Sequence, residues 1–78
     1  MRIDKPTNAQ LNTVFMLIRW SVPTPVAREA TEWLAEKASR REVSGEIARL
    51  RDLNIKHKLS VLECFTGRIW EGFEYERS

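Results

Sequence analysis

Residues 39–51 read SRREVSGEIARLR, and this stretch decides the fold expected for the chain. Ser39 with Glu42 forms a capping box, in which each side chain accepts a hydrogen bond from the backbone N–H of the other residue. Apolar residues follow at intervals of four and three positions, as on one face of an α-helix: Val43, Ile47 and Leu50. The stretch therefore predicts a helix over residues 40–53.

Two more helices are predicted before this one. The first, over residues 8–20, opens with a second capping box, Thr7 with Gln10. Its apolar stripe has helical spacing: Leu11, Val14, Phe15 and Ile18. The second covers residues 25–38 and starts at Thr24-Pro25, because proline suits the first helical position. Almost no residues separate the second and third helices, so the chain must turn sharply there, as in a helix-turn-helix.

After the third helix the apolar period changes from that of a helix to that of a strand. Thr66-Gly67 is typical of a tight turn, and the residues that follow alternate. Phe73 and Tyr75 share the face expected to pack on the helices, with Trp70 on the opposite face. This pattern predicts a two-stranded antiparallel hairpin over about residues 55–76.

The expected fold class is therefore α+β. The arrangement is a winged helix-turn-helix, with three helices followed by the hairpin as the wing, in a single domain of residues 1–78.

Charge is distributed unevenly along the chain. The formal net charge is only +2. Residues 37–58 carry seven basic and three acidic side chains, a net of +4, and residues 59–78 carry two basic and four acidic, a net of −2. Positive charge around the third helix indicates an anionic partner there.

The outer face of the third helix has the composition of a DNA-reading surface. Small residues let the backbone approach a groove, and arginines contact guanine or phosphate. The residues expected to contact double-stranded DNA there are Arg40, Arg41, Ser44, Gly45, Ala48 and Arg49. Lys56 and Lys58 would hold the backbone, and Arg68 at the tip of the wing would reach a minor groove.

Each of these features also has a simpler interpretation. A charged helix face is usually only a solvated one, Arg68 suits an ordinary exposed turn, and the two lysines suit protection of a strand edge. Gly45 favours the DNA interpretation, because glycine costs a helix about 1 kcal/mol relative to alanine.

Enzymatic and metal sites are not expected. His57 is the single histidine and Cys64 the single cysteine, so a zinc site would need carboxylates as its other ligands. No phosphate-binding glycine loop is present. We therefore predict no enzyme, no catalytic residue, no metal and no cofactor.

A cytoplasmic location is expected, with no membrane partner. The lone cysteine suits a reducing compartment, and the first residues lack the apolar stretch of a signal peptide. The longest apolar run, Val14 to Ile18, is too short to span a bilayer.

The order of these features resembles the small winged helix-turn-helix DNA-binding domains of phages and prophages. The likeness covers roughly residues 8–77. It rests on the following residues: Asn8-Ala9-Gln10, Thr24-Pro25, the run from Val43 to Arg51, Gly67-Arg68, and the aromatics Phe73 and Tyr75. The second helix is longer than in that family and the wing is acidic. The resemblance implies a repressor, an excisionase-like factor or an accessory regulator.

The sequence is consistent with two functions. The first is a DNA-binding regulator of transcription or recombination, with the third helix in the major groove and a homodimer on a paired site. The alternative is a protein-interaction module on the same scaffold, which would use the acidic hairpin and exposed aromatics: Trp20, Phe65 and Trp70.

Overall fold

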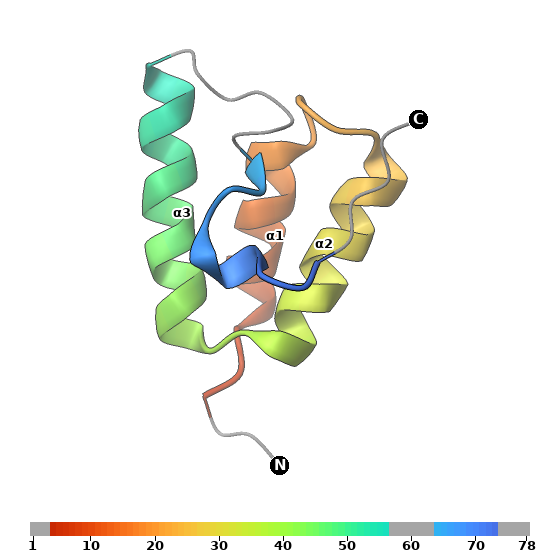
Figure 1. Cartoon of the computed structure of the whole chain (residues 1–78), viewed down its shortest axis with the longest axis vertical. Coiled ribbons are helices and arrows are strands. Elements are labelled where there is room, and N and C mark those ends of the chain that lie inside the picture. The colour runs from red at the N-terminus through yellow and green to blue at the C-terminus, as the bar shows by residue number, and fades with distance from the viewer. Residues whose placement is uncertain (1–3, 57–63, 74–78) are drawn as a thin grey trace.

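The computed structural model describes residues 4–56 and 64–73. Within these residues the elements are α1 (Asn8–Ile18), α2 (Thr24–Lys37), α3 (Arg40–Ile55) and a short 3-10 helix, η1 (Arg68–Trp70). Helices α2 and α3 both pack on α1. The C-terminal segment, residues 64–73, crosses between α2 and α3 on the side opposite to α1 (Figure 1).

Both predicted capping boxes are confirmed. At the start of α1, the Gln10 N–H donates to Thr7 Oγ1 and the Thr7 N–H donates to Gln10 Oε1, each at 3.1 Å. At the start of α3, the Glu42 N–H donates to Ser39 Oγ at 3.1 Å and the Ser39 N–H to Glu42 Oε1 at 2.9 Å. These bonds satisfy N–H groups that a helix start otherwise leaves without partners.

The helix bounds differ from the predicted ones by one or two residues. Helix α2 begins at Thr24 rather than 25, and Pro23 occupies the N-cap position without a side-chain hydrogen bond. Helix α1 ends two residues before the predicted end, and α3 runs two residues past it. Helix ends fray, so differences of this size are expected.

The core lies where the three helices meet and is closed by the C-terminal segment. Its fully or nearly buried apolar residues come from all of these elements: Val14, Ile18, Val22, Ala27, Ala30, Leu34, Ala38, Val43, Leu50, Cys64 and Trp70. The buried alanines of α2 let its backbone approach α1 closely. The stripes predicted for the first and third helices contribute Val14, Ile18, Val43 and Leu50 to this core, through the face that each helix turns inward.

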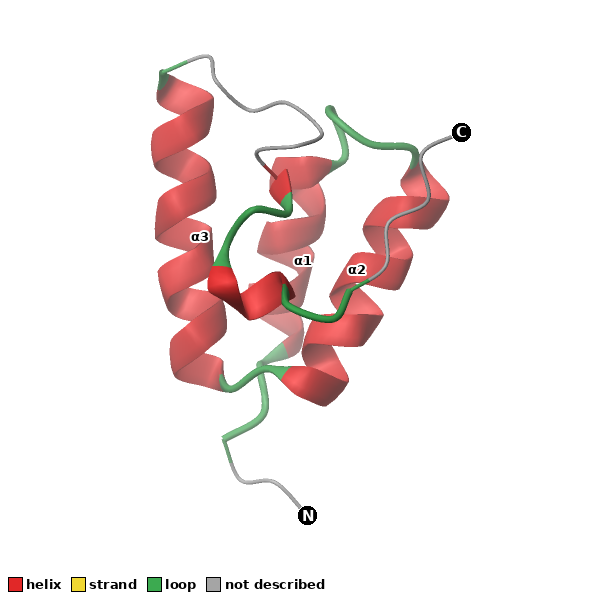
Figure 2. Cartoon of the chain, viewed as in Figure 1, coloured by secondary structure: helices red, strands yellow, loops and turns green. Residues whose placement is uncertain are grey.

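The predicted hairpin is wrong, and with it the α+β winged fold. No strand occurs in residues 4–56 or 64–73, and these residues form an all-helical fold (Figure 2). Where the final strand was expected, the chain turns instead: the Trp70 N–H donates to the Gly67 carbonyl, and the Phe73 N–H to the Trp70 carbonyl. The remainder of the predicted hairpin, residues 57–63 and 74–76 with Lys58 and Tyr75, lies outside the described residues.

Aromatic packing explains why these residues turn. A strand would place Trp70 and Phe73 on opposite faces, whereas the turn brings both to the core side. Trp70 contacts three other rings at centroid distances of 4.9 to 6.0 Å: Trp33, Phe65 and Phe73. A two-stranded hairpin is only marginally stable in water. The conformation that buries these rings against the helices is therefore lower in free energy than a hairpin that leaves them exposed.

This packing also changes the surface available to the protein-interaction alternative. Trp70 is 3% exposed and Phe65 is half-buried, so neither forms the exposed aromatic patch which that alternative needs. Trp20 is exposed, and the guanidinium of Arg19 lies 4.5 Å from its ring centroid.

Candidate nucleic-acid interface

The side of α3 that faces away from the core brings together five of the residues predicted to contact DNA. Val43, Glu46 and Leu50 mark the buried side of this helix. Six exposed residues on the opposite side and on one flank are together called the basic α3 face: Arg40, Arg41, Ser44, Gly45, Ala48 and Arg51. Arg51 was not among the residues expected to contact DNA, and its exposure in line with Ser44 and Ala48 adds it to the face.

Small residues form the middle of the basic α3 face. Gly45 is exposed, and a Cβ atom added to it would meet nothing within 4 Å. Glycine is therefore not required here by any neighbour in the described part of the chain. Together with Ser44 and Ala48 it leaves the helix backbone accessible to a large, flat partner.

The acidic residues of α3 do not neutralise these arginines. Glu42 is engaged in the capping box with Ser39. Asp52 pairs with Lys56 across one helical turn, Oδ2 to Nζ at 3.1 Å. None of the three arginines of the face forms an ion pair with a residue that the structure describes. Their charges therefore point to solvent, where an anionic partner would meet them.

A shallow depression of about 620 Å³ lies at the N-terminal end of the face. It is lined by Asp4, Gln10, Arg40, Arg41 and Ser44. The Arg40 backbone holds its two sides together, since its N–H donates to the Asp4 carbonyl and its carbonyl accepts from Gln10 Nε2 at 3.2 Å. Two guanidinium groups and a hydroxyl suit a phosphate oxygen, whereas the Asp4 carboxylate reduces the attraction for an anion.

Arg49, also predicted to contact DNA, is turned toward the C-terminal segment instead. Its Nε donates to Glu46 Oε1 at 2.9 Å and its Nη2 to Glu46 Oε2 at 2.5 Å. The same guanidinium donates to the Cys64 carbonyl at 2.9 Å and to Thr66 Oγ1 at 3.3 Å. We therefore leave Arg49 out of the basic α3 face.

Glu46 is the centre of this polar group and was missed by the sequence pattern. Its side chain is only 3% exposed, and Trp70 Nε1 donates to its Oε2 at 2.5 Å. A buried carboxylate is costly unless it is paired and hydrogen-bonded, and the two donating side chains meet that requirement. One signal was available, because a helical rotation of about 100° per residue places Glu46 within about 60° of Val43.

Gly67 permits this polar group to close. A Cβ atom there would lie 2.9 Å from Glu46 Oε1 and 3.2 Å from Arg49 Nε, although the backbone φ of −68° is ordinary for any residue. The missing side chain, rather than unusual backbone geometry, is what the position requires.

Alanine substitutions at two glycines should therefore have opposite effects. We expect Gly67→Ala to lower the free energy of unfolding by about 1 to 3 kcal/mol, since the hydrogen-bonded atoms it meets cannot move freely. Gly45→Ala should raise it by about 0.5 to 1 kcal/mol, because alanine favours a helix and has open space there. Urea unfolding monitored by circular dichroism measures both, and a loss of stability at position 45 would contradict the open geometry.

The remaining predicted residues are dispersed. Lys56 is exposed at the C-terminal end of α3, and Lys58 lies outside the described residues. Arg68 is exposed at the first residue of η1 and is not at the tip of a wing. The part of the chain that the structure describes contains no group of three potential metal ligands and no helix long and apolar enough to cross a membrane. Comparison of the chain with protein-family models, curated proteins and solved structures found no match.

Proposed function

We propose that the protein binds double-stranded DNA through the basic α3 face. The observation that carries this proposal is the open strip of Ser44, Gly45 and Ala48 between exposed arginines. Glycine lowers the stability of a helix interior, and no described neighbour of Gly45 requires its small size. A partner that approaches the helix backbone closely would account for a glycine at this position.

The expected binding mode places α3 in the major groove. Arg41 and Arg51 would contact base edges or phosphates from the two ends of the strip, and Arg40 with Ser44 would hold a phosphate at the N-terminal depression. One helix reads few base pairs, so sequence specificity would require two copies on a paired site. A regulator of transcription or recombination in the cytoplasm fits this mode.

Charge on α2 supports approach from the α3 side. Helix α2 exposes two basic side chains, Arg28 and Lys37, and three carboxylates: Glu29, Glu32 and Glu36. The carboxylates repel a polyanion, whereas the basic α3 face attracts one. DNA would therefore be oriented toward α3 before any specific contact forms.

Arginine variants of the face test this proposal. We expect protein and a fluorescent 25-base-pair duplex to bind at low salt, with log K falling linearly as log salt rises. Arg41→Ala and Arg51→Ala should each reduce that slope by about 1, since each removes about one phosphate contact. Fluorescence anisotropy at several salt concentrations provides the measurement.

Arg28→Ala is the matched control. It removes the same charge from an exposed position on α2, outside the face, and should leave the slope unchanged. Equal effects of Arg28→Ala and Arg41→Ala would show that net charge alone determines binding. Absence of binding at low salt would overturn the proposal, because even non-specific DNA binding is strong under that condition.

A further inference from the structure

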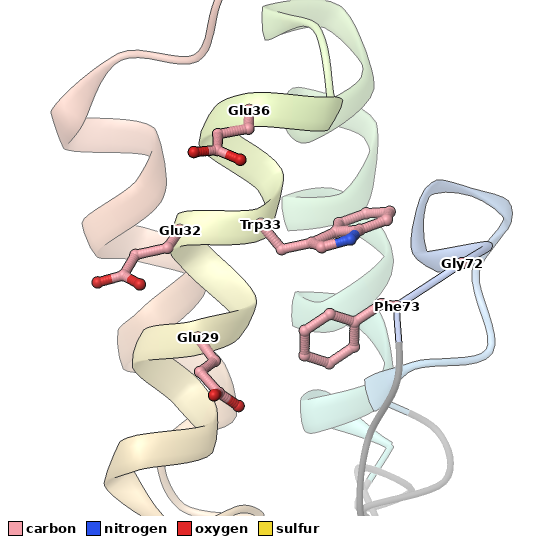
Figure 3. A pocket seen from close by; sticks show the side chains of 6 residues that line it. All are labelled: Glu29, Glu32, Trp33, Glu36, Gly72 and Phe73. Atoms are coloured by element: carbon pink, nitrogen blue, oxygen red, sulfur yellow. The ribbon is translucent and has the colours of Figure 1, made fainter.

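We propose a second binding site, between α2 and the C-terminal segment, that takes an arginine side chain of a partner polypeptide. A pocket of about 460 Å³ lies there, on a different helix from the basic α3 face (Figure 3). It combines aromatic and acidic side chains with one glycine: Trp33, Phe73, Glu29, Glu32, Glu36 and Gly72. This inference is independent of the proposed DNA binding.

The aromatic wall of the pocket is held in place by the core. Trp70 is buried and stacks on Trp33, with ring centroids 6.0 Å apart and planes inclined by 22°. Phe73 meets Trp33 edge-on at 5.6 Å. Trp33 and Phe73 are themselves half-buried and line the pocket. Their positions are therefore fixed before any ligand arrives, which lowers the entropic cost of binding.

Gly72 brings the chain back against this wall. Its φ of +92° lies in the left-handed region that favours glycine, and a Cβ atom there would lie 3.9 Å from Trp33 Cζ2. The turn places Phe73 beside the indole, so that the two rings enclose one side of the pocket (Figure 3).

The acidic side of the pocket is electrostatically unfavourable in the free protein. Glu29 and Glu32 project from successive turns of α2, and both are exposed. Like charges three or four residues apart on a helix repel each other. Figure 3 shows the Glu29 carboxylate extending on the side of the Phe73 ring. A bound cation would remove this repulsion, so the pocket has charge complementarity for a positive ligand.

An arginine fits both walls better than other cations do. Its planar guanidinium stacks on an aromatic ring and at the same time donates two parallel hydrogen bonds to a carboxylate. A lysine ammonium is a more strongly hydrated point charge and lacks the flat surface. A metal ion would make no use of the rings. The combination of rings and carboxylates therefore points to arginine.

Nuclear magnetic resonance with the whole chain tests the site. The probe is a blocked glycine peptide with one central arginine, and the matched control peptide has citrulline, which has nearly the same shape but no charge. We expect the Trp33 indole N–H signal to shift saturably with the arginine peptide, with a dissociation constant of about 1 mM or weaker, as suits a few exposed contacts. The Trp20 indole signal, far along the chain and outside the pocket, should not move.

Charge variants complete the test. The double variant Glu29→Gln/Glu32→Gln should weaken arginine-peptide binding at least about threefold, while Asp52→Asn on α3 should leave it nearly unchanged. Equal shifts with the citrulline peptide, or equal affinity for a lysine peptide, would overturn the assignment to arginine. No saturable shift at Trp33 would overturn the site itself. None of these outcomes depends on DNA binding, which the same variants should retain.

Discussion

Glu46→Ala should lower the free energy of unfolding by about 3 kcal/mol, because it removes a buried carboxylate that holds α3 to the C-terminal segment. The Glu46 side chain is buried and accepts hydrogen bonds from Arg49 and from the Trp70 indole N–H. Without it, the Trp70 N–H is buried with no acceptor, and the Arg49 charge loses its counter-ion. Arg49 is 28% exposed and regains some hydration, so the effect falls at the low end of the range for buried ion pairs.

Asp52→Asn is the matched control for this prediction. It also removes an acidic partner from an α3 ion pair, but both members of that pair are about 60% exposed. Its effect should stay within about 0.5 kcal/mol. Glu46→Gln should fall between the two, since the amide oxygen still accepts one hydrogen bond without carrying charge. Urea unfolding measures all three variants, and equal stability of Glu46→Ala and Asp52→Asn would contradict the structural role of the buried carboxylate.

The three α-helices were predictable because their signals are local. A capping box needs only residues three positions apart, and both boxes form as expected. The apolar stripes also lie within single helices, so Val14, Val43 and Leu50 reach the core as predicted. In these segments the local pattern and the tertiary packing favour the same structure.

The C-terminal segment was not predictable in the same way, because its conformation depends on residues far away in sequence. Alternating apolar residues after Gly67 favour a strand locally. The actual turn is stabilised by Trp70, which contacts Glu46 and Trp33 on two different helices. Tertiary contacts of this kind commonly override a short local pattern.

The residues of the candidate site also differ in whether local sequence determines their position. The exposure of Arg41, Ser44 and Ala48 follows from helical periodicity alone and was predicted. The inward turn of Arg49 depends on the Cys64 carbonyl and on Gly67, which approach α3 only in the folded chain. Helical periodicity predicts that every arginine on the outer side of the helix is exposed to a partner. It cannot show which of them forms hydrogen bonds with a segment that is distant in sequence.

Trp70→Ala should have the largest effect of the substitutions considered, a loss of about 4 kcal/mol of unfolding free energy. The indole is 3% exposed, packs on three other aromatic rings and donates to Glu46. Alanine removes this burial, leaves a cavity and takes one donor from a buried carboxylate. A domain of this length is stable by only about 4 to 12 kcal/mol, so the variant should be close to unfolding at 25 °C.

Trp20→Ala is the matched control, because it is the same substitution at a side chain that is 79% exposed. It should change the unfolding free energy by no more than about 0.5 kcal/mol. Thermal and urea unfolding, followed by the circular dichroism of the helices, distinguish two roles for the C-terminal segment. If the segment were a separable appendage, Trp70→Ala would leave the helices as stable as Trp20→Ala does. If the segment closes the core, loss of Trp70 destabilises α1, α2 and α3 together in one transition, because Trp33 and Glu46 lose their shared partner at the same step.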